Sequence, residues 1–150
     1  MKLDGRIEIA APPAAVWAFL LDPEQLSSCV PGVRDVQAVD DRTFTGRIGL
    51  AVGPMQSDMA FRSVIVREDF PGDLGVTMTG TDALTKSTMT SEVTIALDEP
   101  DAGRTVLRYR AQVDVKGRLA ILGDMILRAS AGAVINEVAK RLRSRLESAT

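Results

Sequence analysis

The chain contains no histidine at all and a single cysteine, Cys29. Histidine is the commonest general base and a frequent zinc ligand, so its absence argues against a Ser-His catalytic triad and against most zinc sites. One cysteine cannot form an internal disulfide, and Cys29 has no histidine or lysine beside it in the sequence that would activate its thiol. We therefore expect Cys29 to be an inert, packed residue.

Neither sign of charge dominates the chain, because it has 18 Lys and Arg residues and 20 Asp and Glu residues, for a net charge of −2. Nucleic-acid-binding proteins are usually clearly basic, so this balance argues against a nucleic-acid partner. Long apolar runs are missing too, both at the N-terminus, where a signal peptide would lie, and over the roughly 18 residues that a membrane span needs. The sequence predicts a cytoplasmic protein.

A length of 150 residues, with 45% hydrophobic and 25% charged side chains, is typical of one folded domain, residues 1–150. Leu3, Ile7 and Ile9 alternate with charged residues, which predicts a half-buried first strand. Two short helices follow it. The first is the apolar run 16–21, and the second begins at Asp22-Pro23, where Gln25 completes a capping box.

Residues 33–116 keep a period of two, with short turns between apolar segments, and this pattern predicts six more strands joined as antiparallel hairpins. After Gly117 the period changes to 3.6, which predicts a long C-terminal helix. The expected fold class is α+β, with a curved seven-stranded antiparallel sheet around that helix.

Charged residues of the predicted strands fall almost entirely on the parity opposite to the apolar ones, with Arg67 as the exception. The inner face should therefore carry hydroxyl groups instead of ionisable ones, and its polar members are Ser57, Ser63, Ser91 and Tyr109. General acid–base catalysis needs a titratable group within reach of the substrate, so the pattern argues against an enzyme. An ordinary core that excludes charge would show the same pattern.

Bulky aromatic side chains are few, with one Trp, one Tyr and four Phe, so a curved sheet of this length can leave a cavity unfilled. Met59, Met78 and Met89 fall on the inner parity of three consecutive strands. Methionine is flexible and suits a surface that repacks around varied apolar ligands, although it also fills ordinary cores. The candidate ligand-binding residues are Trp17, Phe44, Ile48, Met59, Phe61, Met78, Met89, Leu119, Leu122, Met125 and Ile126.

Trp17 is either a core residue or a residue of the cavity mouth, because its indole N–H needs a partner. We find no catalytic residue, no metal-ligand spacing and no glycine-rich phosphate loop after a strand, so no catalytic site, metal or cofactor is predicted.

The predicted C-terminal helix is apolar nearly all round in its first turns. Leu119, Leu122 and Ile126 project to one side, and Ile121 and Met125 project to another. Such a segment must be buried or must meet a ligand, a partner or a bilayer. The far end of the helix is basic, which either the helix dipole or contact with anionic lipid or an acidic partner explains. We favour the apolar turns as the contact.

Six short motifs resemble those of a known family. They are Val16-Trp17, Leu21-Asp22-Pro23-Glu24-Gln25-Leu26, Cys29-Val30-Pro31-Gly32, Val52-Gly53-Pro54, Thr105-Val106-Leu107-Arg108-Tyr109 and Val115-Lys116-Gly117-Arg118-Leu119-Ala120-Ile121-Leu122-Gly123. Together they resemble the CoxG family of carbon monoxide dehydrogenase subunits. The resemblance spans the whole chain, and its last motif is the most specific. Leu142 departs from the pattern, which has a bulky aromatic residue near this position.

The resemblance implies the START-like, SRPBCC superfamily and its helix-grip fold, which birch-pollen-allergen-like proteins share. It implies a non-enzymatic accessory protein that binds a hydrophobic ligand, a quinone or lipid, in an apolar cavity. It also implies that the protein links a molybdenum CO dehydrogenase-type oxidoreductase to the membrane, as a peripheral contact on the cytoplasmic face of the inner membrane. Pro31-Gly32 and residues 119–123 match the family pattern and are expected at the cavity mouth.

Two alternatives remain open. One is a small-molecule enzyme of the cyclase or dehydratase type found in the same superfamily, and the other is a pure protein–protein adaptor with a solid interior. A charge-free inner face distinguishes the accessory protein from the enzyme, and the interior volume distinguishes it from the adaptor.

Overall fold

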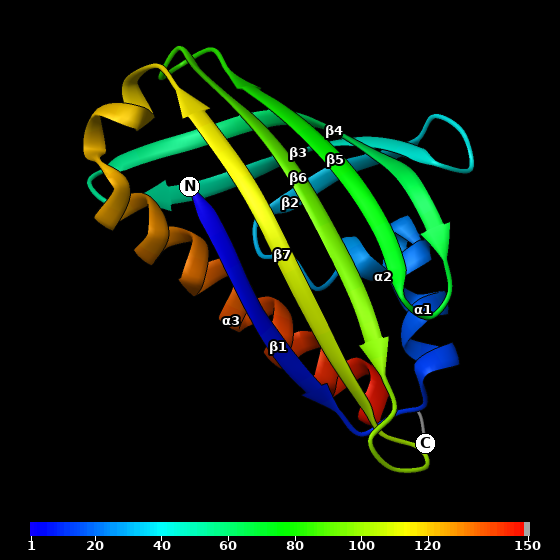
Figure 1. Cartoon of the computed structure of the whole chain (residues 1–150). Coiled ribbons are helices and arrows are strands. Elements are labelled where there is room, and N and C mark those ends of the chain that lie inside the picture. Colours follow the sequence, from blue (N-terminus) through cyan, green and yellow to red (C-terminus); the bar gives the residue numbers. More distant parts are fainter. Residues whose placement is uncertain (149–150) are drawn as a thin grey trace.

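The computed structural model describes residues 1–148 of the chain as one curved antiparallel sheet, two short helices and a long helix (Figure 1). The elements are β1 (Lys2–Ile9), α1 (Pro13–Leu21), α2 (Pro23–Ser27), β2 (Val33–Ala38), β3 (Thr43–Val52), β4 (Met55–Asp69), β5 (Asp73–Asp82), β6 (Ser87–Asp98), β7 (Thr105–Lys116), the 3₁₀ helix η1 (Arg118–Leu122) and α3 (Asp124–Glu147). The strands pair in the order β1-β7-β6-β5-β4-β3-β2. The predicted fold class is confirmed.

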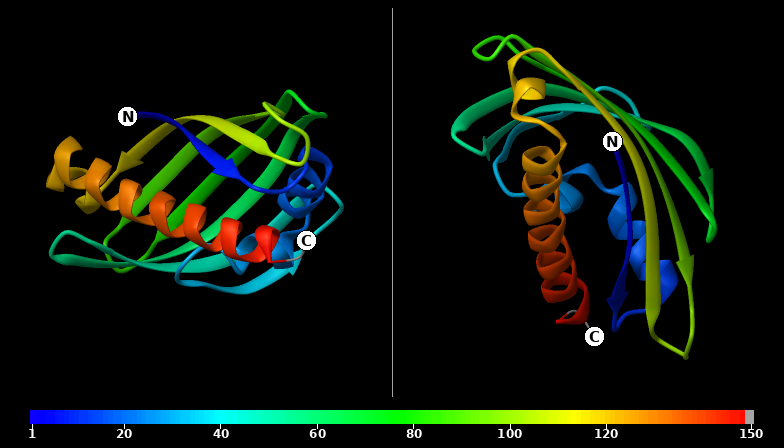
Figure 2. Two further views of the ribbon diagram at one scale, coloured as in Figure 1. Left: turned by 90° about the horizontal axis from the view of Figure 1, so that it is seen from below. Right: turned by 60° about the vertical axis from the view of Figure 1, so that its left-hand side comes forward.

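The sheet curves around α3, which crosses its concave side (Figure 2). At one end of α3 the guanidinium of Arg128 donates a 2.8 Å hydrogen bond to the carbonyl of Lys2, and near the other end Arg143 donates a 2.8 Å bond to the carbonyl of Glu8. The residue numbers rise from the first bond to the second in both elements, so α3 runs alongside β1 in the same direction. α3 therefore lies along β1 on the concave side of the sheet.

The N-cap predicted at Asp22 forms at the start of α2, but the reciprocal bond of a capping box does not, because the amide of Asp22 donates to the carbonyl of Phe19. The carboxylate of Asp22 accepts hydrogen bonds from the amides of Glu24 (3.0 Å) and Gln25 (3.3 Å), and the side chain of Gln25 returns to it at 3.2 Å. These bonds satisfy amides that the first turn of a helix leaves without partners. They fix the corner between α1 and α2, which lie near the C-terminal end of α3 in Figure 1.

A bulge in β4 explains why Arg67, a charged residue, falls on the inner parity in the sequence. The pairing of β4 with β5 shifts register between Ile65 and Arg67, so Arg67 lies on the convex face. There its guanidinium donates to the carboxylate of Asp73 at 3.1 Å and covers Gly75, where a Cβ atom would come within 2.8 Å of it. The alternation alone had placed Arg67 on the inner parity.

The long C-terminal helix starts later than the 3.6-residue period predicts. Residues 118–122 form the separate helix η1, and α3 begins only at Asp124. Gly117 (φ +94°) precedes η1 and Gly123 (φ +89°) follows it, in backbone conformations that other residues rarely adopt. The prediction of one continuous helix through residues 119–126 is therefore wrong, because a glycine reverses the backbone between η1 and α3.

The core consists of two separate apolar clusters, one at each end of α3. The larger cluster packs α1 and the last turns of α3 against β1, β6 and β7, and it includes Val16, Cys29 and Leu142. Burial raises the pKa of the Cys29 thiol, which agrees with the inert residue that the sequence predicts. The smaller cluster consists of Val52, Met59 and Leu119 with partly buried neighbours. The two clusters leave the middle of the concave face between them.

Candidate functional site

Apolar side chains line the middle of the concave face without packing into either core cluster. From the sheet come Phe44, Phe61, Met78, Val93 and Val113, and from α3 come Val134 and Ile135; we call this set the central zone. Except for Phe61, which is buried, these side chains are only half-buried, on the sheet and on the helix alike. Solvent therefore reaches apolar surface between the sheet and α3, where a solid core would exclude it.

The structure brings most of the eleven candidate residues to this interior. Phe44, Phe61 and Met78 belong to the central zone, and Phe44 meets Phe61 edge to face with ring centroids 5.9 Å apart. Five others pack together in the smaller cluster: Ile48, Met59, Met89, Leu119 and Leu122. Ile126 lies beside the β3–β4 turn, where a Cβ atom on Gly53 would come within 2.9 Å of it.

Two candidates lie elsewhere. Trp17 is buried in the larger cluster, and its ring meets that of Phe70 edge to face at 5.2 Å, so it is a core residue at the far end of the molecule. Met125 is 84% exposed on the first turn of α3, with Ile121 of η1 83% exposed nearby in the chain. The placement of Met125 inside the cavity is therefore corrected, because the break at Gly123 turns this residue to the surface.

Gly80 is a residue of the interior that the sequence analysis missed. It lies opposite Phe61 on one neighbouring strand and Met89 on the other. A Cβ atom on Gly80 would lie 3.2 Å from the Met59 sulfur and 3.7 Å from the terminal methyl of Met89. The absence of a side chain at Gly80 thus leaves room for the side chains of both methionines. The sequence did hold a signal for this position, because a glycine inside a strand often marks a close approach of other groups.

Asp82 was also missed, and it is the only acidic or basic side chain that is buried within residues 1–148. Its carboxylate accepts hydrogen bonds from the hydroxyls of Ser57 (2.8 Å) and Thr85 (2.9 Å) and from the amides of Leu84 (2.9 Å) and Asp58 (3.2 Å). Burial alone would raise the pKa of Asp82, but these bonds outweigh it and hold that pKa below its ordinary value. An ionised, fully engaged carboxylate stabilises the fold and is unsuited to act as a general acid.

The same polar cluster holds η1 in place. The amide of Leu119 donates a 3.0 Å hydrogen bond to Oγ of Ser87, and the hydroxyl of Thr85 lies 2.9 Å from that oxygen. Leu119 is buried while its neighbours in η1 reach the surface. The corner between β7 and α3 therefore packs against the smaller cluster through Leu119 and Leu122 and is held by a buried hydrogen bond.

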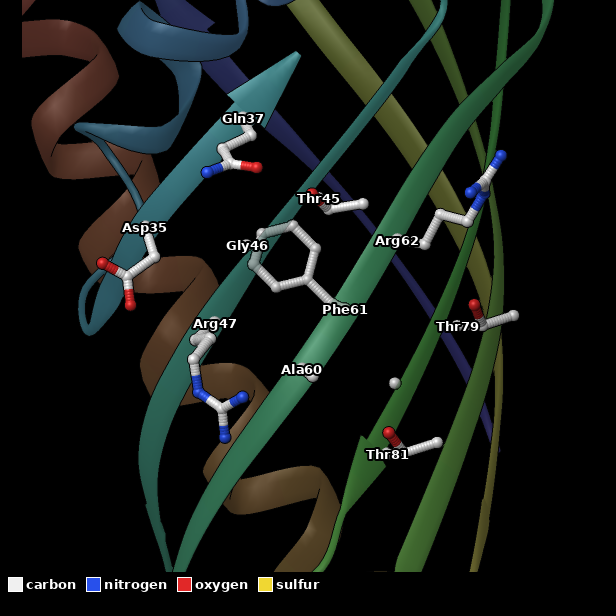
Figure 3. A pocket seen from close by; sticks show the side chains of 11 residues that line it. Asp35, Gln37, Thr45, Gly46, Arg47, Ala60, Phe61, Arg62, Thr79 and Thr81 are labelled. Atoms are coloured by element: carbon white, nitrogen blue, oxygen red, sulfur yellow. The ribbon is translucent and has the colours of Figure 1, made fainter. Parts of the chain in front are cut away.

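A hollow of about 490 Å³ lies on the convex face, on the far side of the sheet from α3 (Figure 3). Its rim includes Arg47, Arg62 and Thr79, and its floor includes Ala60. Arg47 is already engaged, because it donates a 3.3 Å hydrogen bond to Asp58. This hollow is open to solvent, and its lining includes Phe61 and Gly80, which also belong to the apolar interior.

Within residues 1–148, no group of three or more His, Cys, Asp or Glu side chains is placed to hold a metal ion. Over the same range no helix combines the length and the apolar character needed to span a bilayer.

Comparison with known proteins gives one family and many structures of the same fold. The sequence model of CoxG, a family of carbon monoxide dehydrogenase subunits, matches residues 5–147. No curated protein sequence matches the chain.

A conserved protein from Geobacillus kaustophilus superposes with a TM-score of 0.91 at 19% identity, over 99% of this chain and 96% of that one. A START superfamily protein from Mycobacterium smegmatis gives 0.72 at 13% identity, over 99% of both chains. The Zhui aromatase/cyclase from Streptomyces sp. R1128 gives 0.72 at 14% identity, over 98% of this chain and 93% of the other. At these identities the structural likeness shows a shared START-type fold.

Proposed function

The chain belongs to the CoxG family of carbon monoxide dehydrogenase subunits, and on that premise we propose that it is an accessory protein that holds a hydrophobic molecule, a quinone or a lipid, between its curved sheet and α3. The observation that carries the proposal is the central zone, whose apolar side chains are half-buried on both the sheet and the helix. Covering such surface with a ligand removes it from water and stabilises the complex by roughly 25 cal/mol per Å².

The interior supports binding of an apolar ligand better than it supports catalysis. Asp82 is the only buried acidic or basic side chain in the described part of the chain, and its carboxylate accepts from the hydroxyls of Ser57 and Thr85 and from three backbone amides. A cyclase or dehydratase needs a titratable group near the reacting atoms. The aromatase/cyclase neighbour shares the fold at 14% identity and by itself favours no reaction here.

The partner that we propose is a molybdenum CO dehydrogenase-type oxidoreductase, because the family is named as a subunit of carbon monoxide dehydrogenase. An accessory protein that exchanges a quinone or lipid with such an enzyme must also reach the membrane that stores these molecules. We therefore place it as a peripheral protein on the cytoplasmic face of the inner membrane.

A surface suited to that contact lies at the η1 end of the molecule, where the β5–β6 turn and η1 meet through Leu119 and Ser87 (Figure 1). Three large apolar side chains there are exposed: Leu84 by 75%, Ile121 by 83% and Met125 by 84%. Exposed cations flank them in the chain at Lys86, Lys116 and Arg118. We call these six residues the η1 surface, and its composition fits an anionic bilayer.

The basic end of α3 is a weaker candidate for the membrane contact, because its arginines bind the protein itself. Arg141 pairs with Glu137 at 2.9 Å, Arg143 donates to the Glu8 carbonyl, and Arg145 donates a 2.7 Å hydrogen bond to the Ser28 hydroxyl. These contacts fix α3 to β1 and to the end of α2. The apolar turns that the sequence analysis favoured therefore remain the better proposal.

Native mass spectrometry after detergent-free purification tests the bound ligand directly. We expect an adduct with the mass of a quinone or lipid, and we expect delipidated protein to take up an added decyl-quinone. Val134→Trp, on the half-buried face of α3, should block uptake, whereas Ala133→Trp on its exposed neighbour should leave uptake unchanged. Protein that carries no adduct and takes up no quinone would contradict the proposal and favour a solid adaptor.

A further inference from the structure

The concave face carries two serine hydroxyls that have no hydrogen-bond partner within residues 1–148, those of Ser63 and Ser91. Ser63 is only 3% exposed and Ser91 only 9%, yet the only fully buried side-chain oxygen or nitrogen without a partner in residues 1–148 is Oδ1 of Asp58, so both serine Oγ atoms keep some contact with solvent on the concave face. Other deeply buried hydroxyls on the same face are bonded. Ser57 donates a 2.8 Å bond to Asp82, and Thr105 donates a 2.7 Å bond to the carbonyl of Ala11. Ser63 and Ser91 therefore stand out as unpaired.

Strand register places the two serines symmetrically in the central zone. Met78 of β5 pairs with Ser63 of β4 on one side and with Ser91 of β6 on the other. Adjacent strands lie about 4.8 Å apart, so the two serines are roughly 10 Å apart across Met78. Phe44 pairs with Ser63 on its outer side, and Val113 pairs with Ser91. The two hydroxyls therefore stand in one row of otherwise apolar side chains facing α3.

We propose that Ser63 and Ser91 are specificity-determining residues of the concave site, and that they donate hydrogen bonds to oxygen acceptors on an otherwise apolar ligand. This inference rests on the proposed function, because it assigns a ligand chemistry to the same site. Two carbonyl oxygens, one on each side of Met78, are the simplest pair of acceptors for hydroxyls at this separation.

The physical reason lies in the cost of an unpaired hydroxyl. A ligand that covered these hydroxyls without accepting their hydrogen bonds would displace water from them and bury them unpaired, at a cost of about 1–3 kcal/mol each. The two hydroxyls flank the same methionine in the zone that neither core cluster fills, so one ligand in that zone would cover both. A hydrocarbon ligand would leave both hydroxyls unpaired, so the site favours an oxygen-bearing ligand over a hydrocarbon of the same shape.

A matched pair of probes tests this inference: 2,3-dimethyl-1,4-naphthoquinone and 2,3-dimethylnaphthalene, which share a ring skeleton and differ in the two carbonyls. Binding is measured by equilibrium dialysis on the full chain. We expect Ser63→Ala and Ser91→Ala each to weaken quinone binding by about threefold to tenfold, the value of one hydrogen bond, and to leave hydrocarbon binding unchanged. Thr90→Ala, on the exposed face next to Ser91, is the control and should change neither.

The outcomes separate this inference from the proposed function. If wild-type protein binds both probes and the Ser63→Ala/Ser91→Ala variant binds the quinone as tightly as wild type, the serine assignment is overturned and the apolar site stands. If wild type binds neither probe, the proposed function fails and this inference fails with it. If the serine variants bind both probes more weakly to the same extent, the serines only maintain the shape of the site, and the assignment is also overturned.

Discussion

The backbone amide of Leu119 donates a hydrogen bond to the side-chain oxygen of Ser87, 32 residues earlier in the chain, and this bond fastens η1 to the β5–β6 turn. Ser87 in turn lies within 2.9 Å of the Thr85 hydroxyl, which contacts the carboxylate of Asp82. A buried polar cluster thus holds the corner from which Leu119 packs into the smaller cluster. The stability of that corner should govern how easily a ligand enters.

Replacing Ser87 with alanine removes the acceptor of a buried amide, so we expect the free energy of unfolding to fall by about 1–3 kcal/mol. Hydrogen exchange at the Leu119 amide should become faster, and release of a bound quinone should become faster with it. Thr88→Ala, one residue along β6 on the exposed face, is the control and should alter neither rate. Unchanged exchange at Leu119 in Ser87→Ala would show that other contacts hold η1.

Asp82 should give the protein a distinct dependence of stability on pH. Its pKa in the folded state lies below the ordinary value of about 3.9 because its hydrogen bonds outweigh the effect of burial. A lowered pKa means that the ionised carboxylate stabilises the folded state. That contribution is complete above about pH 4 and is lost as the pH falls toward the pKa of the folded state.

Asp82→Asn should therefore be less stable than wild type at pH 7, and the difference between the two should narrow below about pH 4. Urea unfolding of both proteins across this range measures it. The comparison isolates Asp82, because other acids whose pKa is also lowered, such as Asp58 and Asp98, are present in both proteins. A difference that stays constant down to pH 3 would contradict the assignment.

Strand alternation was enough to predict the sheet and its inner face, because a half-buried strand repeats every two residues. It placed Met59, Met78 and Met89 correctly on the concave side. It did not reveal the bulge that turns Arg67 outward, since a bulge changes the register without changing the composition. Asp82 follows the inner parity of Gly80, but it stands at the end of β5, where a turn was as good an interpretation as a strand.

The contacts that close the site were beyond the reach of local patterns. The hydrogen bond between Leu119 and Ser87 joins residues of different hairpins, and no spacing in the sequence indicates it. A helical projection puts Leu122 and Met125 on different sides, but it does not indicate which side packs against the sheet. Gly123 was the available signal, because a glycine between two apolar turns is a common helix boundary.

The glycines that flank η1 should differ in their tolerance of a side chain. At Gly123 (φ +89°) a Cβ atom would meet nothing within 4 Å, so Gly123→Ala should cost only backbone strain, about 1–3 kcal/mol. At Gly117 (φ +94°) a Cβ atom would also overlap the carbonyl oxygen of Lys86, so Gly117→Ala should be the more destabilising change.

Gly132 is the matched control, because it lies inside α3 with open space around it, and alanine there should stabilise the protein by about 0.5–1 kcal/mol. Thermal unfolding of the three variants measures this order. Equal losses at residues 117 and 123 would show that the β7–η1 corner moves freely away from Lys86.

The η1 surface should bind anionic vesicles through its apolar side chains. Ile121 and Met125 are more than four-fifths exposed, so Ile121→Asp/Met125→Asp should fold normally. Burying one large apolar side chain contributes about 1.5–3 kcal/mol, and the double change should therefore lower vesicle binding at least tenfold in co-sedimentation. Val39→Asp/Val66→Asp, at exposed apolar residues away from η1, is the control.

The cations of the η1 surface should add a weaker contribution that depends on salt. Reversing Lys86 and Lys116 to glutamate should weaken vesicle binding in low salt, and added salt should mimic that change in wild type. Reversing Arg141 and Arg143 should lower stability and leave binding intact, because both already bind within the fold. Equal binding by wild type and the aspartate variant would remove the η1 surface from the proposed membrane contact.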